Sequence, residues 1–232
     1  EICGGKTQQD TPIELFWCDS CRVPIIVEAS DPGTHFCPIC GKQLRYLAKD
    51  LRPVFPEERL LLEIIQGKPF AYEQSSVWAS GSRYYIDGKV SNLSIDLLKK
   101  LDANKISAEL EKYHQKNTYE FFNHIIGLFV QCNKERLNSI KQEAENFVRE
   151  QVSLFPNHKP VISFSGGKDS TVVTDIVIRA LSNPSIVQIF GDTTLEFPIT
   201  YEYVARHRKQ NPLAIIKTAK NKEQEFYDDC DE

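Results

Sequence analysis

The stretch that decides the fold reads Pro160-Val-Ile-Ser-Phe-Ser-Gly-Gly-Lys-Asp-Ser170. Its first half, Val161 to Phe164, is a short apolar run of the kind found in buried strands. A glycine pair follows, and residues 170–181 are then rich in Val, Ile and Ala at helical spacing. A strand, a glycine turn and a helix in this order predict a ligand-binding loop at the N-terminus of the helix.

The loop itself contains the residue types that bind an anion. Gly166 and Gly167 permit backbone angles that other residues avoid, so main-chain N–H groups can approach a ligand closely. Lys168 adds a positive charge, and Ser165 and Ser170 add hydroxyl donors. We therefore expect a phosphate-binding loop.

Asp169 is expected to cap the free N–H groups at the start of the helix. The loop is not a Walker A motif, because Asp169 follows Lys168 where that motif has Ser or Thr, and Ile162 stands where it has its first glycine. The alternative interpretation is a glycine turn before a capped helix, without a ligand.

Strands and helices continue to alternate after the loop. Residues 186–190 and 213–216 read as strands, residues 197–209 as a helix that ends near Asn211-Pro212, and residues 222–227 as the start of another helix. This alternation predicts the α/β class, with parallel βαβ units and right-handed crossovers.

Asp192 follows the strand expected at residues 186–190, at the edge where open α/β sheets bind their ligands. A carboxylate at this position could accept a hydrogen bond from a ribose hydroxyl or bind a magnesium ion. Capping of the helix that begins near Phe197 is the alternative role.

The hexapeptide Ser165-Gly-Gly-Lys-Asp-Ser170 resembles the SGGKDS signature of the PP-loop ATP pyrophosphatase superfamily. The resemblance implies an adenine nucleotide α-hydrolase-like fold with a parallel sheet. The segment Gly191-Asp-Thr-Thr-Leu-Glu-Phe-Pro-Ile-Thr200 resembles the second motif, DTG-x-x-FPET, of the 3′-phosphoadenylyl-sulfate (PAPS) reductase family.

This second motif departs from the family pattern at two positions. Thr194 stands in place of the usual glycine and Ile199 in place of the usual glutamate, for which the nearby Glu196 could partly substitute. The resemblance implies that the site binds ATP with magnesium, PAPS or adenylyl sulfate. Its expected residues are Ser165, Gly166, Gly167, Lys168, Asp169, Ser170, Asp192, Thr193 and Glu196.

The group that would react with such a ligand is unknown from the sequence. In the family reductases, a cysteine in an ECGLH motif near the C-terminus attacks the sulfonucleotide, and thioredoxin or glutaredoxin then releases sulfite. That motif is absent here, and acidic neighbours disfavour a thiolate at Cys230. Two reactions stay open: sulfonucleotide reduction with a thioredoxin-like reductant, and ATP-dependent sulfur transfer, as in DNA phosphorothioation, with a cysteine desulfurase.

Two further functions compete with these. An ATP-dependent tRNA thiolase would also combine CxxC pairs with an SGGKDS loop, but the Asp192 motif and the net charge of -4 argue against it. A non-catalytic nucleotide-binding module would explain the missing nucleophile.

Four cysteines near the N-terminus have the spacing C-x2-C-x15-C-x2-C, which is typical of a zinc ribbon. Each CxxC pair can direct two thiolates to one tetrahedral ion. A zinc ion bound by four thiolates has no open coordination position and therefore has a structural role. Disulfides, free thiols and an iron–sulfur cluster are the alternatives. The predicted ligands are Cys18, Cys21, Cys37 and Cys40.

Composition divides the chain into three expected parts. Residues 1–50 form the zinc ribbon, residues 51–133 an α+β and helical middle segment, and residues 134–232 the PP-loop α/β domain, truncated at its C-terminus. The sequence has 232 residues and no methionine, and it stops soon after the third α/β strand. We therefore expect it to be part of a longer protein.

The overall composition is that of a globular protein, with 41% apolar and 26% charged residues. Its charge does not indicate nucleic acid as a partner. The longest apolar-rich stretch, residues 119–132, is too short to span a membrane, and no signal peptide is visible. We expect a cytoplasmic protein that does not enter a membrane, and a homo-oligomer is compatible with the sequence.

Overall fold

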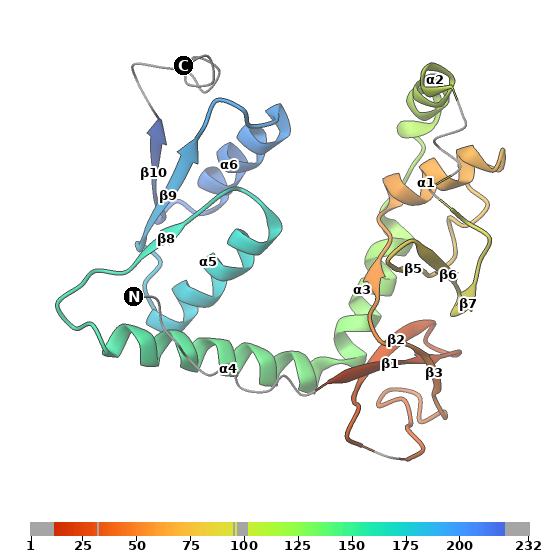
Figure 1. The fold of residues 1–232 in the computed structure, drawn as a ribbon, viewed down its shortest axis with the longest axis horizontal. Helices are drawn as coiled ribbons and strands as arrows, with labels where there is room; N and C mark the ends of the chain where they lie inside the picture. The colour runs from red at the N-terminus through yellow and green to blue at the C-terminus, as the bar shows by residue number, and fades with distance from the viewer. Residues whose placement is uncertain (1–11, 32, 95, 97–101, 221–232) are drawn as a thin grey trace. The chain divides into compact units, whose positions relative to one another are not determined.

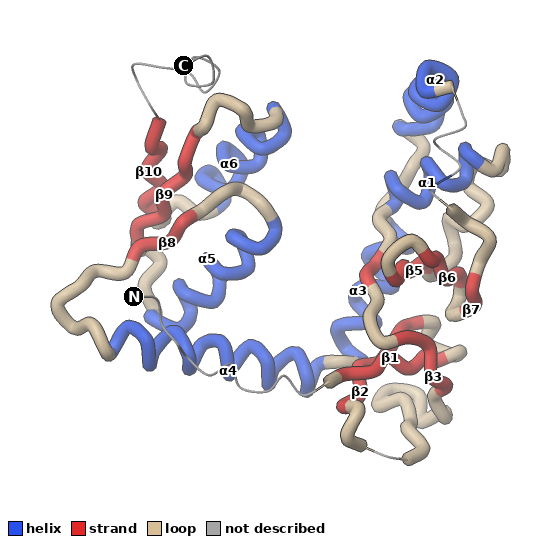
Figure 2. The backbone as a smooth tube through the Cα atoms, in the orientation of Figure 1, coloured by secondary structure: helices blue, strands red, loops and turns tan. Residues whose placement is uncertain are grey.

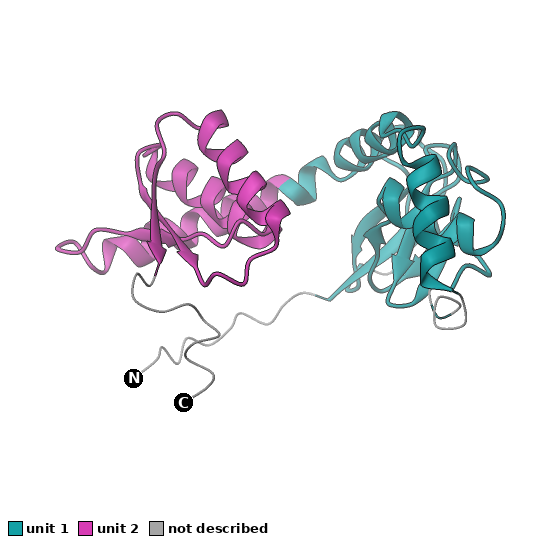
Figure 3. Ribbon diagram, turned by 90° about the horizontal axis from the view of Figure 1, so that it is seen from above, with its two compact units in different colours: residues 1–137 teal, residues 138–232 magenta. Residues whose placement is uncertain are grey.

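The computed structural model describes residues 12–31, 33–94, 96 and 102–220. The chain divides into two units, Glu1–Leu137 (unit 1) and Asn138–Glu232 (unit 2), which Figure 3 shows in different colours. The cysteine pairs belong to unit 1 and the glycine loop belongs to unit 2.

Unit 1 contains two antiparallel sheets, with the strand orders β2-β1-β3 and β4-β5-β6-β7. The strands of the first sheet are β1 (Ile13–Cys18), β2 (Val23–Glu28) and β3 (Arg45–Ala48). Those of the second are β4 (Arg52–Pro53), β5 (Val77–Ser80), β6 (Arg83–Ile86) and β7 (Lys89–Val90). The helices described in this unit are α1 (Pro56–Ile65), α2 (Ala103–His114) and α3 (Glu120–Cys132), and α4 (Lys134–Ser153) continues from it into unit 2.

The main core of unit 1 joins the cysteine-bearing sheet to the segment that follows it. Side chains alternate along β1, so Leu15 and Trp17 are buried on one face. Trp17 belongs to the same buried cluster as Trp78 of β5 and Ile125 of α3. The first sheet, the second sheet and α3 are therefore held by one set of apolar contacts.

Sequence periodicity correctly predicted several elements of unit 1. The residue pattern within the middle segment predicts a helix over residues 57–65 and strands at residues 77–78 and 83–86, and these elements are α1, β5 and β6. The apolar stretch 119–132 is α3. The spacing of Ile95, Leu98 and Leu101 predicts a further helix face, which lies outside the described residues.

Unit 2 alternates strands and helices along residues 161–220, as Figure 2 shows. The elements are β8 (Val161–Ser163), α5 (Lys168–Leu181), β9 (Val187–Asp192), α6 (Pro198–Gln210) and β10 (Ile215–Lys220). The strands form a parallel sheet in the order β10-β9-β8. This confirms the expected α/β class with a parallel sheet.

Helices α5 and α6 lie on the same side of this sheet (Figure 1). Consecutive parallel strands joined by right-handed crossovers have this arrangement. The side chains on that face of the strands are buried, among them Ile162, Gln188 and Phe190, while Val161 and Ile189 on the opposite face are exposed. Phe164, Phe190 and Val204 of α6 form the core cluster beneath the helices.

The boundaries of β9 and β10 differ from the sequence prediction. Strand β9 extends to Asp192, so this residue ends the strand instead of following it. Strand β10 begins at Ile215 instead of Leu213, because the turn at Asn211-Pro212 continues until the Ala214 N–H donates to the Asn211 carbonyl at 3.0 Å. The helix expected at residues 222–227 and Cys230 lie outside the described residues.

Within the described part of the chain, no helix combines the length and the apolar character that a membrane crossing requires.

Candidate functional site

The candidate nucleotide site lies at the carboxyl edge of the parallel sheet in unit 2. The Ser165–Gly167 turn leads from the end of β8 into α5, and Asp192 ends the neighbouring strand β9. Because Ser163 is the register partner of Ile189, the loop after β8 and the end of β9 are adjacent. The two motifs that the sequence singled out therefore meet at one edge.

The glycine pair shapes the turn. Gly166 has a φ of +75°, in the left-handed region that favours glycine, and Gly167 is the N-cap residue of α5. The N–H groups of Lys168, Asp169 and Ser170 begin the helix and have no acceptor inside it. They carry the positive end of the helix dipole, which is the arrangement that binds anions.

The two serines of the loop bond to each other and to the loop backbone. The Ser165 hydroxyl donates to Ser170 Oγ at 3.1 Å, and Ser170 Oγ donates to the Gly167 carbonyl at 3.0 Å. Thr171 Oγ1 donates to the same carbonyl at 2.8 Å. These bonds hold the turn in its shape without a ligand.

Lys168 and Asp169 form an exposed ion pair at the start of α5. Lys168 Nζ lies 2.7 Å from Asp169 Oδ1, with side-chain exposures of 89% and 87%. The expected cap by Asp169 is wrong, because Gly167 occupies the N-cap position and the Asp169 carboxylate binds Lys168 instead. An exposed pair of this kind is worth only about 0–1 kcal/mol, so Lys168 is free to turn to an anion.

Asp192 is held in place through one of its two carboxylate oxygens. Oδ1 accepts hydrogen bonds from the Tyr201 hydroxyl at 2.6 Å and from the Thr194 N–H at 3.0 Å. The bond from Tyr201, the bond from Thr194 and the positive charge of Lys220 lower the pKa of Asp192. The hydrogen bond to Asp192 raises the pKa of Tyr201 to about 12. Asp192 is therefore an anion at neutral pH.

The turn after Asp192 contains a strained residue and an internal hydrogen bond. Thr194 has a φ of +67°, which is unfavourable for a β-branched residue. This geometry explains why glycine is the usual residue at that position of the motif it resembles. Thr193 Oγ1 donates to Glu196 Oε1 at 3.1 Å, so Glu196 supports the turn.

Helix α6 contributes site residues that the sequence reasoning missed. Tyr201 binds Asp192, and the Tyr203 hydroxyl lies 2.9 Å from Thr171 Oγ1 on α5. A Cβ atom added to Gly166 would come within 3.3 Å of Thr200 Cγ2. The only sequence signal was an aromatic pair directly after the second motif, and aromatic residues on helices most often serve packing.

His207 of α6 is partly buried and packs against the core of unit 2. Its ring stacks on Phe164 with centroids 4.7 Å apart, and its Nε2 lies 3.2 Å from Oε1 of the fully buried Gln188. Burial lowers the pKa of His207. The residue supports α6 beneath the loop.

The four predicted metal ligands of unit 1 come together in one cluster. Their sulfur atoms all lie within 4.8 Å of one another, with Cys18 and Cys40 3.4 Å apart and Cys21 and Cys37 3.7 Å apart. A disulfide would need about 2.05 Å. Four thiolates around zinc, each about 2.3 Å from the ion, have sulfur separations of this size. The cluster therefore fits a metal ion such as zinc.

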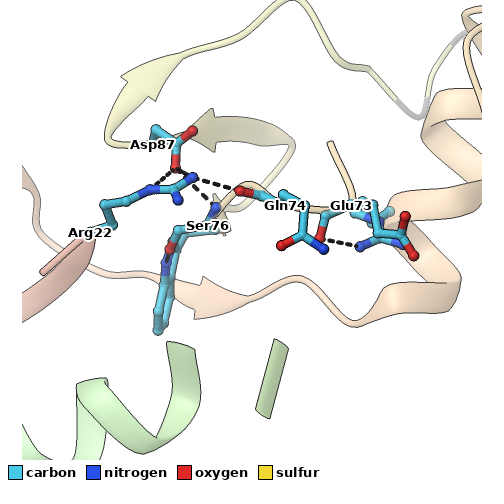
Figure 4. A network of polar contacts seen from close by, with 7 residues as sticks. Arg22, Glu73, Gln74, Ser76 and Asp87 are labelled. Atoms are coloured by element: carbon cyan, nitrogen blue, oxygen red, sulfur yellow. Dashed lines mark hydrogen bonds and ion pairs between the residues drawn. The ribbon is translucent and has the colours of Figure 1, made fainter. Parts of the chain in front are cut away.

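The turn that contains Cys18 and Cys21, the first cysteine knuckle, is linked to the second sheet by a polar network (Figure 4). Arg22 follows Cys21 and donates to Asp87 Oδ1 through Nε at 2.9 Å and Nη2 at 2.6 Å. Its Nη2 also donates to the Gln74 carbonyl at 2.8 Å, and the Ser76 N–H donates to Asp87 Oδ1 at 3.0 Å. The knuckle thereby also fixes the β6–β7 turn.

Comparison with known proteins gives one family match. The model of the phosphoadenosine phosphosulfate reductase domain matches residues 159–229, which include the loop and Asp192. No solved structure matched the chain at comparable significance.

Two curated proteins of Methanocaldococcus jannaschii are similar to this chain, and both are described as uncharacterized. MJ0973 is 29% identical over 90 residues, covering 38% of this chain and 21% of its own length. MJ0066 is 30% identical over 108 residues, covering 46% of this chain and 22% of its own length. The chain thus spans only about a fifth of the relatives it matches.

Proposed function

We propose that unit 2 binds an adenine nucleotide or sulfonucleotide through Ser165–Ser170 and Asp192, because the model of the phosphoadenosine phosphosulfate reductase domain matches residues 159–229. The phosphate or sulfate groups bind the loop, and the ribose side binds Asp192. The observation that carries the proposal is the meeting of both motifs at the carboxyl edge of one parallel sheet.

The loop provides a binding site for the anionic end of such a ligand. The left-handed turn at Gly166 exposes the main chain, and the N–H groups that begin α5 point toward the anion. Lys168 exchanges its exposed contact with Asp169 for a contact with a phosphate or sulfate oxygen. Magnesium bound with ATP would neutralise further phosphate charge and offset the negative charge of Asp169.

The reaction belongs to sulfur chemistry, either sulfonucleotide reduction or ATP-dependent sulfur transfer. In the reduction, a thiolate attacks the sulfur of the sulfonucleotide, the S–O bond to the nucleotide phosphate breaks, and the nucleotide leaves. A second thiol then releases sulfite as a disulfide forms. Residues 138–220 contain no cysteine, so the attacking thiol must come from elsewhere in the protein or from a partner.

The cysteine cluster of unit 1 has a structural role in this proposal. Four thiolates complete a tetrahedral zinc site and leave no open position for a substrate. Burial raises the pKa of the Cys18 thiol, so binding of the ion includes release of its proton.

Calorimetric binding of ATP, PAPS and adenylyl sulfate to the full chain tests the proposal. Lys168→Ala should weaken binding roughly tenfold or more, because it removes a charge-assisted hydrogen bond worth about 1.5–3 kcal/mol. Lys159→Ala is the matched control, since this exposed lysine precedes the opposite end of β8. Failure of all three ligands to bind, or equal losses in the two variants, would refute the proposal.

A further inference from the structure

Tyr201 joins the two segments of the candidate site through a hydrogen bond to Asp192. We propose that Tyr201 is a positioning residue that holds Asp192 Oδ1 and presents Oδ2 to a ribose hydroxyl of the bound nucleotide. This inference rests on the proposed function, and it assigns the ribose contact to one oxygen of Asp192 and names the residue that holds the other.

The two oxygens of Asp192 have different surroundings. Oδ1 accepts from the Tyr201 hydroxyl at 2.6 Å and from the Thr194 N–H at 3.0 Å. Among the described residues no donor contacts Oδ2, and the side chain is partly exposed. A carboxylate fixed through one oxygen has a single directed acceptor left, which suits one hydroxyl donor.

The Tyr201 side chain is 39% exposed and is held by a ring contact in addition to its hydrogen bond. It projects from the first turn of α6, which begins at Pro198, and its edge contacts Phe190 with ring centroids 6.2 Å apart. Phe190 is 2% exposed and lies on β9, two residues before Asp192. Tyr201 therefore binds the carboxylate from a helix that packs on the same strand.

Helix α6 also contacts the phosphate loop and the helix that follows it. Val204 and Thr200 face Gly166, and the Tyr203 hydroxyl lies 2.9 Å from Thr171 Oγ1. Residues of one helix thus contact both the anion-binding loop and Asp192. A nucleotide needs a fixed separation between the two, because its phosphate and its ribose hydroxyls lie a set distance apart.

A ribose hydroxyl fits this oxygen better than a divalent cation. Two hydrogen bonds to Oδ1 draw negative charge away from the carboxylate, and Lys220, the register partner of Asp192 on β10, adds positive charge beside it. Both effects weaken attraction for magnesium, whereas a neutral hydroxyl donor is much less affected. The charge of the carboxylate also disfavours phosphate at this position.

The test compares Tyr201→Phe with Tyr203→Phe, which removes a hydroxyl from the same helix without touching Asp192. ATP and adenylyl sulfate are each titrated beside their 2′-deoxy and 3′-deoxy forms. We expect Tyr201→Phe to weaken the complete nucleotide about five- to tenfold. For the analogue that lacks the recognised hydroxyl, the same substitution should change affinity less than twofold. Tyr203→Phe should affect complete and deoxy ligands equally.

The outcomes separate the inference from the proposed function. Equal weakening of complete and deoxy ligands by Tyr201→Phe, or a loss that appears only with magnesium present, would overturn the positioning role while nucleotide binding stands. If the unsubstituted chain binds neither ATP nor adenylyl sulfate nor PAPS, the proposed function fails, and the positioning role fails with it.

Discussion

A Cβ atom built on Gly166 would lie only 3.0 Å from Val204 Cγ2, closer than such atoms ordinarily approach. The glycine has a φ of +75°, which would strain any other residue. We therefore expect Gly166→Ala to lower the free energy of unfolding of unit 2 by about 1–3 kcal/mol. Urea unfolding followed by circular dichroism measures this loss.

Gly167→Ala is the matched control for this variant. Gly167 has a φ of -84°, and its added Cβ would meet only Ser165 Oγ, at 3.4 Å. Gly167→Ala should lower the free energy of unfolding by less than about 1 kcal/mol, within the range of substitutions that cause no strain. Equal losses for the two alanine variants would show that the contact with α6 does not constrain the loop.

Thr194→Gly should stabilise unit 2. The left-handed conformation at φ +67° costs a non-glycine residue roughly 1–2 kcal/mol. The larger backbone entropy that glycine loses on folding offsets about 0.5–1 kcal/mol of the relief. The expected net gain is about 0.5–1 kcal/mol in urea unfolding. Thr193→Gly has no such strain to relieve and should destabilise, so a loss in both variants would contradict the interpretation.

Local sequence patterns predicted the loop and its surroundings well. Val161–Phe164, the glycine pair and the periodic residues after it are neighbours in the chain, so their spacing alone indicates strand, turn and helix. The cysteine spacing predicted the thiol cluster for the same reason. The cap assigned to Asp169 was wrong because the choice between Gly167 and Asp169 as N-cap depends on where the helix begins, within one or two residues.

Local sequence patterns could not predict the contacts that depend on tertiary packing. The hydrogen bond of Tyr201 to Asp192 depends on how α6 lies on β9, and the sequence gives Tyr201 no mark that distinguishes it from a packing aromatic. The same holds for His207, because the basic residues beside it, Arg206, Arg208 and Lys209, indicate only a helix end whose charges offset the helix dipole. Its partner Gln188 lies nineteen residues away, in the centre of the sheet.

The stability of unit 2 should fall with acidification because of His207. Burial lowers its pKa in the folded state, so the folded protein binds fewer protons than the unfolded chain. The contribution is complete above the ordinary histidine pKa of about 6.5 and is lost as pH falls from there toward the depressed folded value. Urea unfolding followed by circular dichroism should show a lower free energy of unfolding at pH 5.5 than at pH 7.5.

His207→Phe keeps a ring against Phe164 but removes the titrating group. It should lower stability at pH 7.5, since Gln188 loses its partner, yet shrink the difference between the two pH values. His158→Phe, at an exposed histidine of the same unit, should leave that difference unchanged. A pH dependence that survives His207→Phe would assign it to another group.

If the four thiols hold zinc as proposed, its removal should unfold the first sheet of unit 1, and the two tryptophans of the sequence report it. Trp17 and Trp78 are each 1% exposed and share a buried cluster with Cys18 and Cys37. Structural zinc contributes roughly 10–16 kcal/mol in small domains, more than such a core can replace. A strong chelator should therefore shift tryptophan emission to longer wavelength and release one zinc ion per chain, measured with a colorimetric indicator.

Cys132→Ser is the matched control, because Cys132 is buried in the same cluster but is not one of the four grouped thiols. It should keep one zinc ion per chain, whereas Cys37→Ser should lose or weaken it. Loss of zinc in both variants would mean that the ligand set extends beyond the four predicted cysteines. Unchanged emission after complete metal removal would instead mean that the core around Trp17 is stable by packing alone, which would leave the thiol cluster without the structural role assigned to it.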